Sequence, residues 1–314
     1  MTRRSERAPT GEPAIDSWPL VRRRLAELAT IPGRLLVVTD FDGTLAPISL
    51  DPMAARIEPL ARSALRSLAR LEAARPLRLK VVVLSGRTAR DVAARVRVGG
   101  IEYHGDHGVQ VGFLPRRVPA ERLAARSDPA LAPLVDGARA LSVAVATRLD
   151  RPDWLFVEDK GPSVAFHFRA APDPDAAAAL VGAAVEAALA GQRGGDGQPG
   201  FVRFDGRRIV ELRPSGAGGK GATMTRLLAP GSFDAAMVLG DDRSDAEAFA
   251  AVAAARAEGR LAASLTLAVH GSVETPPEVV ATADLMVAGP HQAAQALAAL
   301  ARALGPGASG RGSD

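Results

Sequence analysis

Two aspartates stand two residues apart in the segment LLVVTDFDGTLAPIS (residues 35–49). A carboxylate can attack a phosphorus atom as a nucleophile and form an aspartyl-phosphate. A second carboxyl group can protonate the leaving oxygen and later take a proton from water. Gly43 allows a sharp turn, which brings the hydroxyl of Thr44 to the same loop. The segment therefore suggests phosphoryl transfer, although a strand that ends in an Asx turn would need only one such aspartate.

Polar residues that suit the same chemistry follow other apolar or glycine-rich runs: Ser85, Lys220, Asp241, Asp242 and Asp245. Taken alone, a serine can be a helix cap, a loop lysine a solvated charge, and an aspartate a first-turn helix charge. At one crevice, the lysine and the hydroxyls would neutralise a phosphoryl group. The carboxylates would hold a hard cation such as Mg²⁺.

The elements that must position these residues alternate between strands and helices. Apolar runs at 35–39 and 79–85 predict buried strands, and the apolar spacing over 57–73 predicts a helix. Residues 235–242 (AAMVLGDD) predict another strand, followed by a helix capped by Ser244. Such alternation is typical of an α/β protein with a doubly wound, mostly parallel, Rossmann-like core. In that fold the carboxyl ends of the strands face a common crevice where ligands bind.

The middle of the chain has a different pattern. Residues 153–169 and 201–213 each predict a pair of alternating strands, and residues 172–191 between them predict a helix. We therefore expect an inserted α+β cap domain that covers the crevice, and disordered ends to the chain. The expected division is a tail at 1–17, a core at 18–112 and 214–304, the cap at 113–213, and a tail at 305–314.

The composition excludes several classes of protein. The chain has no cysteine, which rules out disulfides and thiolate chemistry. Its formal charge of +4 suits an anionic substrate, while an aromatic content of 4% leaves few stacking platforms for nucleic acid. No segment resembles a membrane span or a secretory signal. The sequence predicts a cytoplasmic protein that binds neither nucleic acid nor membranes.

Four motifs, taken in order, resemble the haloacid dehalogenase-like phosphatases. They are Asp-x-Asp-Gly-Thr, a serine at a second strand end, a lysine, and Gly-Asp-Asp-x-Ser-Asp. The resemblance covers the chain from about Leu35 to Leu304. It implies that Asp40 is the nucleophile and that Asp42 is the general acid and base.

The same resemblance implies the remaining roles in the core. The phosphoryl group would be bound by Thr44, Ser85 and Lys220. Mg²⁺ would be held by Asp40, Asp241 and the backbone carbonyl of Asp42. Two further aspartates would ligate the metal through water or orient the site: Asp242 and Asp245.

Longer segments are similar to one family, the trehalose-6-phosphate phosphatases: DFDGTLAPI, SGR, YHGDHG, VEDKGPSVAFHFR, ELRP and GDDRSDAEAF. In that family a cap closes over the core and grips the disaccharide. The resemblance implies sugar contacts from Glu158, Lys160 and Glu211, with Arg169 as a further candidate. His107 would touch the substrate or only cap its loop. The alternatives are an exposed salt bridge for Glu158 and Lys160 and a solvent-facing strand position for Glu211.

Two segments depart from the pattern of that family. Its last motif usually reads Thr-Asp-Glu, whereas this chain has Ser244-Asp245-Ala246 followed by Glu247. Its cap strand often has tyrosine and asparagine around the arginine, whereas this chain has Phe168-Arg169-Ala170. The first departure leaves Asp241 intact, and the second weakens the role implied for Arg169.

The resemblance implies Mg²⁺-dependent hydrolysis of trehalose 6-phosphate to trehalose and phosphate, the last step of trehalose biosynthesis. It also implies a functional pairing with a trehalose-6-phosphate synthase. Two alternatives are a phosphatase for another sugar phosphate, such as sucrose 6-phosphate, and a sugar-phosphate sensor without catalysis. Residues 216–221 also match the Gly-x-Gly-x-x-Gly of dinucleotide-binding proteins, which would leave Asp40 and Ser85 unexplained. A P-loop is excluded because Pro214 stands at its first glycine position.

Overall fold

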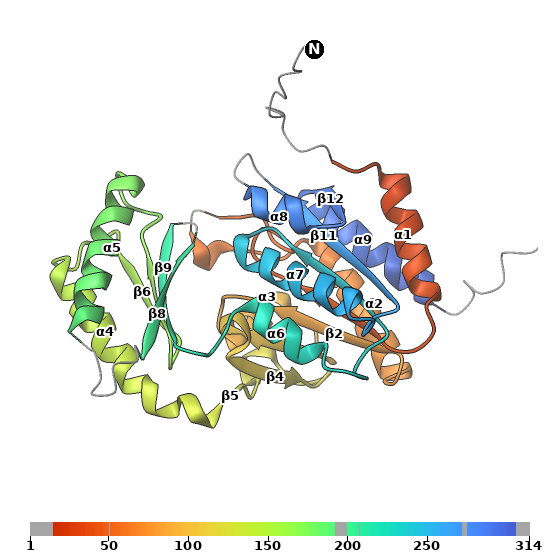
Figure 1. The fold of residues 1–314 in the computed structure, drawn as a ribbon, viewed down its shortest axis with the longest axis horizontal. Helices are drawn as coiled ribbons and strands as arrows, with labels where there is room; N and C mark the ends of the chain where they lie inside the picture. The colour runs from red at the N-terminus through yellow and green to blue at the C-terminus, as the bar shows by residue number, and fades with distance from the viewer. Residues whose placement is uncertain (1–14, 50, 192–199, 207, 272–274, 306–314) are drawn as a thin grey trace, which may run out of the picture.

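Eight strands form the larger of two sheets in the computed structural model, which describes residues 15–49, 51–191, 200–206, 208–271 and 275–305 (Figure 1). Their order is β12-β11-β10-β1-β2-β3-β4-β5. Neighbouring strands from β12 to β3 are parallel. β4 pairs antiparallel with β3 on one side and with β5 on the other. Their bounds are β1 (Leu35–Thr39), β2 (Leu79–Leu84), β3 (Ile101–Gly105), β4 (Gln110–Leu114), β5 (Arg126–Ser127), β10 (Ala235–Gly240), β11 (Ala263–His270) and β12 (Leu285–Ala288).

The direction in which the chain adds strands reverses beside β1. From β1 the chain continues to β2 and β3 on one side, and much later to β10, β11 and β12 on the other. As a result β1 and β10 are parallel neighbours, with Thr39 opposite Leu239. Such a reversal opens a crevice at the carboxyl ends of the two strands. The predicted doubly wound, mostly parallel α/β fold is confirmed.

Helices cover both faces of this sheet, because successive residues of a strand point to opposite sides. Leu35 and Val37 pack into one apolar cluster, and Leu36 and Val38 pack into another. The first cluster contains residues of α1 (Trp18–Thr30), α2 (Pro59–Ala74), α3 (Ala89–Val96) and α9 (Gly289–Leu304). The second contains residues of α6 (Lys220–Leu227), α7 (Arg243–Ala257) and α8 (Pro277–Thr282). No helix of the described residues has the length and apolar character that crossing a membrane requires.

A smaller antiparallel sheet lies to one side of the larger one, in the green part of Figure 1. Its order is β6-β7-β9-β8, with the bounds β6 (Phe156–Asp159), β7 (Val164–His167), β8 (Phe201–Gly206) and β9 (Ile209–Pro214). Two helices share its separate apolar core, α4 (Val135–Arg148) and α5 (Pro174–Ala190). The predicted order of two strands, a helix and two strands is confirmed, and α4 is an element that the sequence patterns did not predict.

Two of the expected boundaries are wrong. The expected start of the inserted module at residue 113 falls inside β4, because Phe113 pairs with Glu102 of β3 and so continues the larger sheet. Asp16, which we expected in a disordered tail, forms a backbone hydrogen bond with Met286 of β12. Most of the expected tails, residues 1–14 and 306–314, lies outside the described residues.

Candidate active site

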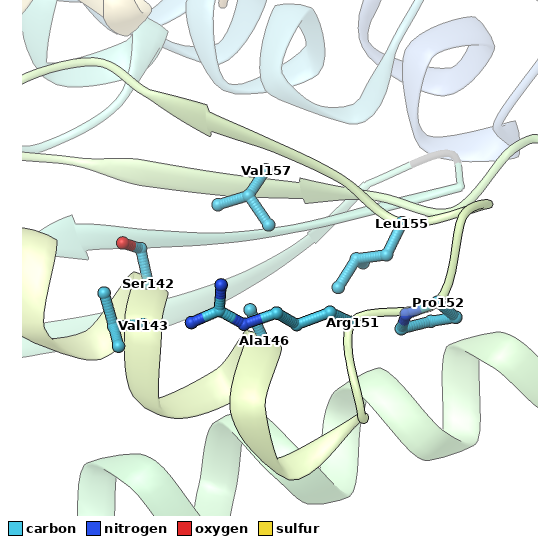
Figure 2. Close-up of a pocket in the computed structure, with 7 residues that line it drawn as sticks. All are labelled: Ser142, Val143, Ala146, Arg151, Pro152, Leu155 and Val157. Atoms are coloured by element: carbon cyan, nitrogen blue, oxygen red, sulfur yellow. The ribbon is translucent and has the colours of Figure 1, made fainter.

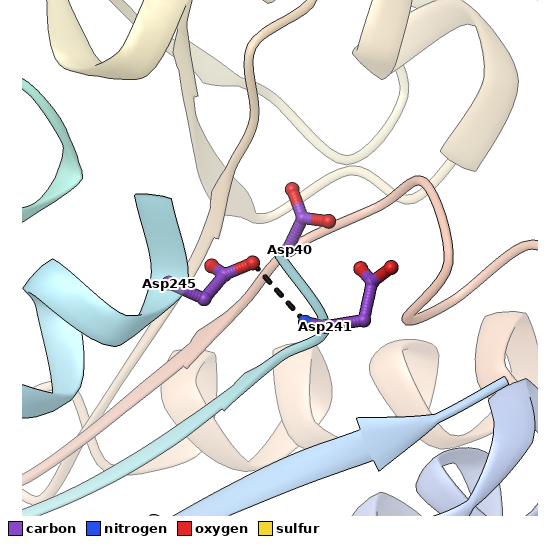
Figure 3. A group of neighbouring side chains, drawn as sticks. All are labelled: Asp40, Asp241 and Asp245. Atoms are coloured by element: carbon purple, nitrogen blue, oxygen red, sulfur yellow. Dashed lines mark hydrogen bonds between the residues drawn. The ribbon is translucent and has the colours of Figure 1, made fainter. Parts of the chain in front are cut away.

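The carboxylates of Asp40, Asp241 and Asp245 meet at the crevice between β1 and β10 (Figure 3). Asp40 directly follows β1, and Asp241 directly follows β10. The N–H of Asp40 donates a hydrogen bond to the carbonyl of Leu239 at 3.0 Å, which continues the pairing of the two strands. One oxygen of each carboxylate lies within 4.8 Å of the others, and all three residues are buried. Adjacent strand ends therefore bring together Asp40 and Asp241, which are 201 positions apart in the chain.

The start of α7 orients one member of this cluster. Asp242 caps the helix, and its carboxylate accepts hydrogen bonds from the N–H of Asp245 at 3.1 Å and from the hydroxyl of Ser244 at 2.7 Å. In return Asp245 Oδ2 accepts from the N–H groups of Asp241 and Asp242 at 3.1 and 3.2 Å. This reciprocal capping box corrects the expectation that Ser244 caps the helix. Ala246, where the family usually has glutamate, is buried in the apolar cluster beside α7.

Lys220 brings a positive charge to the aspartate cluster. Its Nζ lies 2.9 Å from Asp40 Oδ1 and 2.8 Å from Asp245 Oδ1, and the residue is only 1% exposed. It begins α6, after a loop with positive φ at Gly216 and Gly218. This loop leaves β9, a strand of the antiparallel sheet, so it does not connect two parallel strands. The dinucleotide-binding alternative is therefore excluded, because its fingerprint needs such a connection.

The cluster has more negative than positive charge, since it contains three buried carboxylates, and one lysine contacts two of them. Burial raises the pKa of Asp40 to about 6, although the charge of Lys220 lowers it. Burial and the nearby charge of Asp40 also raise the pKa of Asp241. A divalent cation would relieve this repulsion, and carboxylate oxygens are ligands that hard cations prefer. Asp40 and Asp241 are better placed to hold it than Asp245, because both oxygens of Asp245 already accept hydrogen bonds.

Two hydroxyl groups come from the ends of β1 and β2. Thr44 Oγ1 donates to Asp241 Oδ1 at 3.1 Å. The turn before it requires glycine, because Gly43 has a φ of +79° and a Cβ there would lie 1.9 Å from the carboxylate of Asp241. Ser85 follows β2, is 1% exposed, and accepts a hydrogen bond from the N–H of Arg87 at 3.2 Å. The loop after β1 and the end of β2 thus both present hydroxyls near the crevice.

The side chain of Asp42 is held by an arginine to which the sequence motifs assigned no role. Arg87 Nε donates to Asp42 Oδ2 at 2.7 Å, and Nη2 donates to Oδ1 at 2.8 Å. These two parallel bonds form a bidentate ion pair. The motif Ser-Gly-Arg was the available signal, since it places this arginine two residues after Ser85.

A second buried cluster forms where the turn between β6 and β7 meets the larger sheet. Lys160 Nζ lies 2.5 Å from Glu211 Oε1 and donates to the carbonyl of Gly86 at 2.8 Å. His107 Nε2 lies 3.0 Å from Glu211 Oε2. The carbonyl of His107 also accepts a hydrogen bond from Thr223 of α6 at 2.9 Å. These contacts join the smaller sheet to the helix that begins with the lysine of the aspartate cluster.

Arg213 is a further member of this second cluster that the sequence reasoning missed. It follows Glu211 by two residues on β9, donates Nε to Glu211 Oε2 at 2.9 Å, and places Nη2 2.6 Å from His107 Nε2. His107 Nε2 thus lies between the guanidinium of Arg213 and the carboxylate of Glu211. Burial lowers the pKa of His107, which favours the neutral ring. The period of two along a strand was the signal that could have found Arg213.

The residues that were predicted to contact the sugar do not all lie in the second cluster. Lys160 and Glu211 are 4% and 6% exposed, so the exposed alternatives are wrong for both residues. Glu158 Oε2 lies 3.0 Å from His167 Nε2 and 4.0 Å from Lys160 Nζ, at the edge of the second cluster. Arg169 lies elsewhere and donates a hydrogen bond to the carbonyl of Ser49, in the loop after β1.

A separate hollow of about 300 Å³ lies beside α4 and β6 (Figure 2). Its walls are mostly apolar, and the guanidinium of Arg151 extends across it in the close-up. None of the predicted site residues lines it. The lining residues are Ser142, Val143, Ala146, Arg151, Pro152, Leu155 and Val157.

The larger sheet is doubly wound, and buried aspartates and a lysine lie where its strand order reverses. Together with the inserted module, these features define the haloacid dehalogenase-like fold with a cap. The C-terminal domain of C. albicans trehalose-6-phosphate phosphatase has the same fold, with a TM-score of 0.69 and 20% identity over 94% of this chain and 99% of that one. The chain belongs to the trehalose-phosphatase family, whose model matches residues 38–275.

Two curated relatives have similar sequences. The trehalose-phosphate phosphatase of Mycobacterium marinum is 37% identical over 230 residues, which are 71% of this chain and 52% of the relative. The trehalose-phosphate phosphatase of Mycobacterium tuberculosis is 33% identical over 218 residues, 68% of this chain and 50% of the relative. The chain thus spans about half the length of the curated relatives it matches.

Proposed function

We propose that this chain is a phosphomonoesterase that hydrolyses trehalose 6-phosphate to trehalose and phosphate. The observation that carries the proposal is the buried cluster of Asp40, Asp241 and Lys220 where β1 and β10 end. A nucleophilic carboxylate, a carboxylate suited to a metal and a fixed positive charge are what transfer through an aspartyl-phosphate needs. The names of the relatives support the substrate. The functional pairing with a trehalose-6-phosphate synthase and the cytoplasmic location stay predictions.

The proposed reaction has two steps. In the first, an oxygen of Asp40 bonds to phosphorus while the bond from phosphorus to the sugar oxygen breaks, and Asp42 gives that oxygen a proton. In the second, Asp42 takes a proton from a water molecule, which attacks phosphorus and releases phosphate from Asp40. Lys220, 2.9 Å from Asp40, stabilises the charge on the phosphoryl oxygens. The hydroxyls of Thr44 and Ser85 donate to the same group.

Mg²⁺ is the cofactor that we propose for this site. The excess of negative charge among the buried aspartates supports a divalent cation there. Asp40, Asp241 and the backbone carbonyl of Asp42 would hold it, and Asp242 and Asp245 would orient the site or ligate through water. When bound, Mg²⁺ supplies charge that offsets the repulsion between the Asp40 carboxylate and the phosphate dianion.

Removal of Mg²⁺ with a chelator is expected to lower the rate of phosphate release by roughly 100-fold or more, because the negative charge of the transition state is then less well stabilised. Phosphate release from trehalose 6-phosphate measures the rate. Added Mg²⁺ should restore it, whereas Ca²⁺ should restore much less because Ca²⁺ prefers longer bonds and more ligands. A rate that is the same in chelator and in Mg²⁺ would contradict the metal assignment.

We place the sugar at the second cluster. Lys160 and Glu211 offer a donor and an acceptor of the kind that bind sugar hydroxyls. Although burial raises it, the charge of Lys160 holds the pKa of Glu211 well below its usual range, so this side chain is an acceptor only. Glu158, 4.0 Å from Lys160, and His107, 3.0 Å from Glu211, flank this pair. Arg169 is the remaining proposed contact, from the side of the loop after β1.

Glu211→Gln is expected to lower kcat/KM for trehalose 6-phosphate by about 10- to 100-fold, the worth of a hydrogen bond to a charged group. The activity on 4-nitrophenyl phosphate should change by less than about 3-fold, since that substrate has no sugar hydroxyls to bind. Glutamine keeps the shape of the side chain inside the buried cluster. The matched control is Glu186→Gln, an exposed glutamate on α5, which should leave both substrates unaffected. Equal losses on both substrates for Glu211→Gln would remove Glu211 from sugar recognition.

A panel of sugar phosphates, each with and without Mg²⁺, tests the proposed function itself. Trehalose 6-phosphate should give the highest kcat/KM. A higher value for sucrose 6-phosphate would reassign the substrate within the phosphatase class. Tight binding of trehalose 6-phosphate without any phosphate release would instead identify a sensor.

A further inference from the structure

Arg87 contacts several groups of the candidate active site, although the reaction proposed above assigns it no role. It lies between Ser85 at the end of β2 and the start of α3. Its N–H donates to Ser85 Oγ at 3.2 Å, and its carbonyl accepts from the N–H of Asp106 at 2.7 Å. Its side chain is 12% exposed and forms the bidentate ion pair with Asp42. One residue thus contacts both a proposed phosphate ligand and the proposed acid and base.

The guanidinium of Arg87 is itself held in place by a second carboxylate. Its Nη1 donates to Asp91 Oδ2 at 2.9 Å, and the same oxygen accepts from Arg95 Nε at 2.9 Å. Although burial raises it, the hydrogen bond from Arg95 and the charge of Arg87 bring the pKa of Asp91 below its usual value, so Asp91 is ionised. Arg95 continues the chain of contacts to the carbonyls of Met53 and Ala55 at 2.9 and 3.1 Å.

This chain of ion pairs matters because Asp42 is the more exposed member of the catalytic pair. Its side chain is 39% exposed, whereas Asp40 is 5% exposed and contacts Lys220. A carboxylate with this degree of exposure to water would sample several rotamers unless a partner fixed its position. The planar fork of Arg87 binds both of its oxygens, and such geometry fixes the plane of a carboxylate as well as its position.

We propose that Arg87 is a positioning residue that holds the carboxyl group of Asp42 in place for proton transfer to the leaving oxygen. The inference rests on the proposed function and adds to it a residue that acts through Asp42 and not on the phosphoryl group. Each oxygen of Asp42 accepts one hydrogen bond from the fork and keeps a second lone pair that can carry the transferred proton. The fork thus holds the carboxyl group while its free side faces the sugar oxygen.

The test compares aryl phosphates whose leaving groups differ in their need for a proton. In Arg87→Gln, kcat/KM for phenyl phosphate should fall by roughly 10- to 100-fold, a part of what general acid catalysis contributes. The value for 4-nitrophenyl phosphate should change by less than about 3-fold, because its stable phenolate leaves without a proton. Arg87→Lys should share most of the loss on phenyl phosphate, since an ammonium group cannot form the fork. Wild-type activity in Arg87→Lys would overturn the role of the fork.

A double-mutant cycle shows whether Arg87 acts through Asp42. In the Asp42→Asn background, the further change Arg87→Gln should have no added effect on kcat/KM for phenyl phosphate. Additive losses would overturn the inference, because Arg87 would then act on the phosphoryl group by itself. The matched control is Arg90→Gln, which removes an exposed arginine from α3, the helix that follows Arg87, and should match the wild type.

The outcomes separate this inference from the proposed function. A wild-type chain that hydrolyses neither aryl phosphates nor trehalose 6-phosphate would overturn both. An active wild type in which Arg87→Gln matches Arg90→Gln, or loses equally on both aryl phosphates, overturns the inference alone. Thermal unfolding of each variant, expected within a few degrees of the wild type, establishes that the comparison concerns folded protein.

Discussion

Asp40→Asn is expected to lower phosphate release from trehalose 6-phosphate by roughly 10⁴-fold or more, since the loss of a nucleophile removes the covalent route altogether. The amide that replaces the carboxylate has no charge and cannot attack phosphorus at a useful rate. Rapid acid quenching with radiolabelled substrate gives a second readout. The wild type should carry label on the protein during turnover, and the variant should carry none.

The chain should remain folded in this variant, so that the loss reports on chemistry. Lys220 keeps its 2.8 Å contact with Asp245, and one negative charge disappears from a cluster that has too many. We expect the free energy of unfolding to change by about 1 kcal/mol. Asp51→Asn, at an exposed carboxylate in the loop after β1, is the matched control and should retain full activity. An Asp40→Asn protein that keeps more than about a tenth of the wild-type rate would rule out the aspartyl-phosphate mechanism.

Lys220→Met is expected to have the second largest effect, on both stability and activity. The side chain is 1% exposed and lies 2.9 and 2.8 Å from two carboxylates. Its removal leaves buried negative charges without a partner, which should cost roughly 3–5 kcal/mol of the free energy of unfolding. The rate of phosphate release should fall by roughly 100-fold or more, because the phosphoryl oxygens lose a fixed positive charge.

The effect of Mg²⁺ on stability should differ between Lys220→Met and the wild type. A cation bound at the aspartates would replace part of the charge of Lys220, so Mg²⁺ should stabilise the variant more than it stabilises the wild type. Urea unfolding with and without Mg²⁺ measures both effects. The control is Arg226→Met, which removes an exposed cation from the same helix and should change stability by less than about 1 kcal/mol. An unchanged unfolding midpoint in Lys220→Met without Mg²⁺ would contradict the role of Lys220 in balancing the cluster.

The parts of the site that lie at strand ends could be predicted because they depend on local pattern alone. Apolar runs before Asp40 and Asp241 indicated buried parallel strands, and the ends of such strands meet at one edge of a sheet. The capping of α7 was placed two residues too late, since serine and aspartate are both good caps and the chain offers Asp242, Ser244 and Asp245 in succession.

The start of the inserted module was harder to predict from sequence. Residues 110–114 form an antiparallel strand that continues the larger sheet, and a short apolar run of this kind fits either domain equally well. Only pairing with β3 decides to which sheet the run belongs. In contrast, the two hairpins of the module were predicted correctly, because alternating apolar and polar residues mark their strands.

The sequence by itself determined the fold class, the strand ends that carry the aspartates and the residue types that could transfer a phosphoryl group. The tertiary structure alone decided which charged side chains are partners. Arg87 binds Asp42, 45 positions away, and Arg213 lies against His107, 106 positions away. Periodicity tells which face of an element a residue occupies, but the partner of a long side chain depends on how separate elements pack and on which rotamer that packing allows. For that reason the carboxylates of this site could be predicted from the sequence, and the arginines that hold them could not.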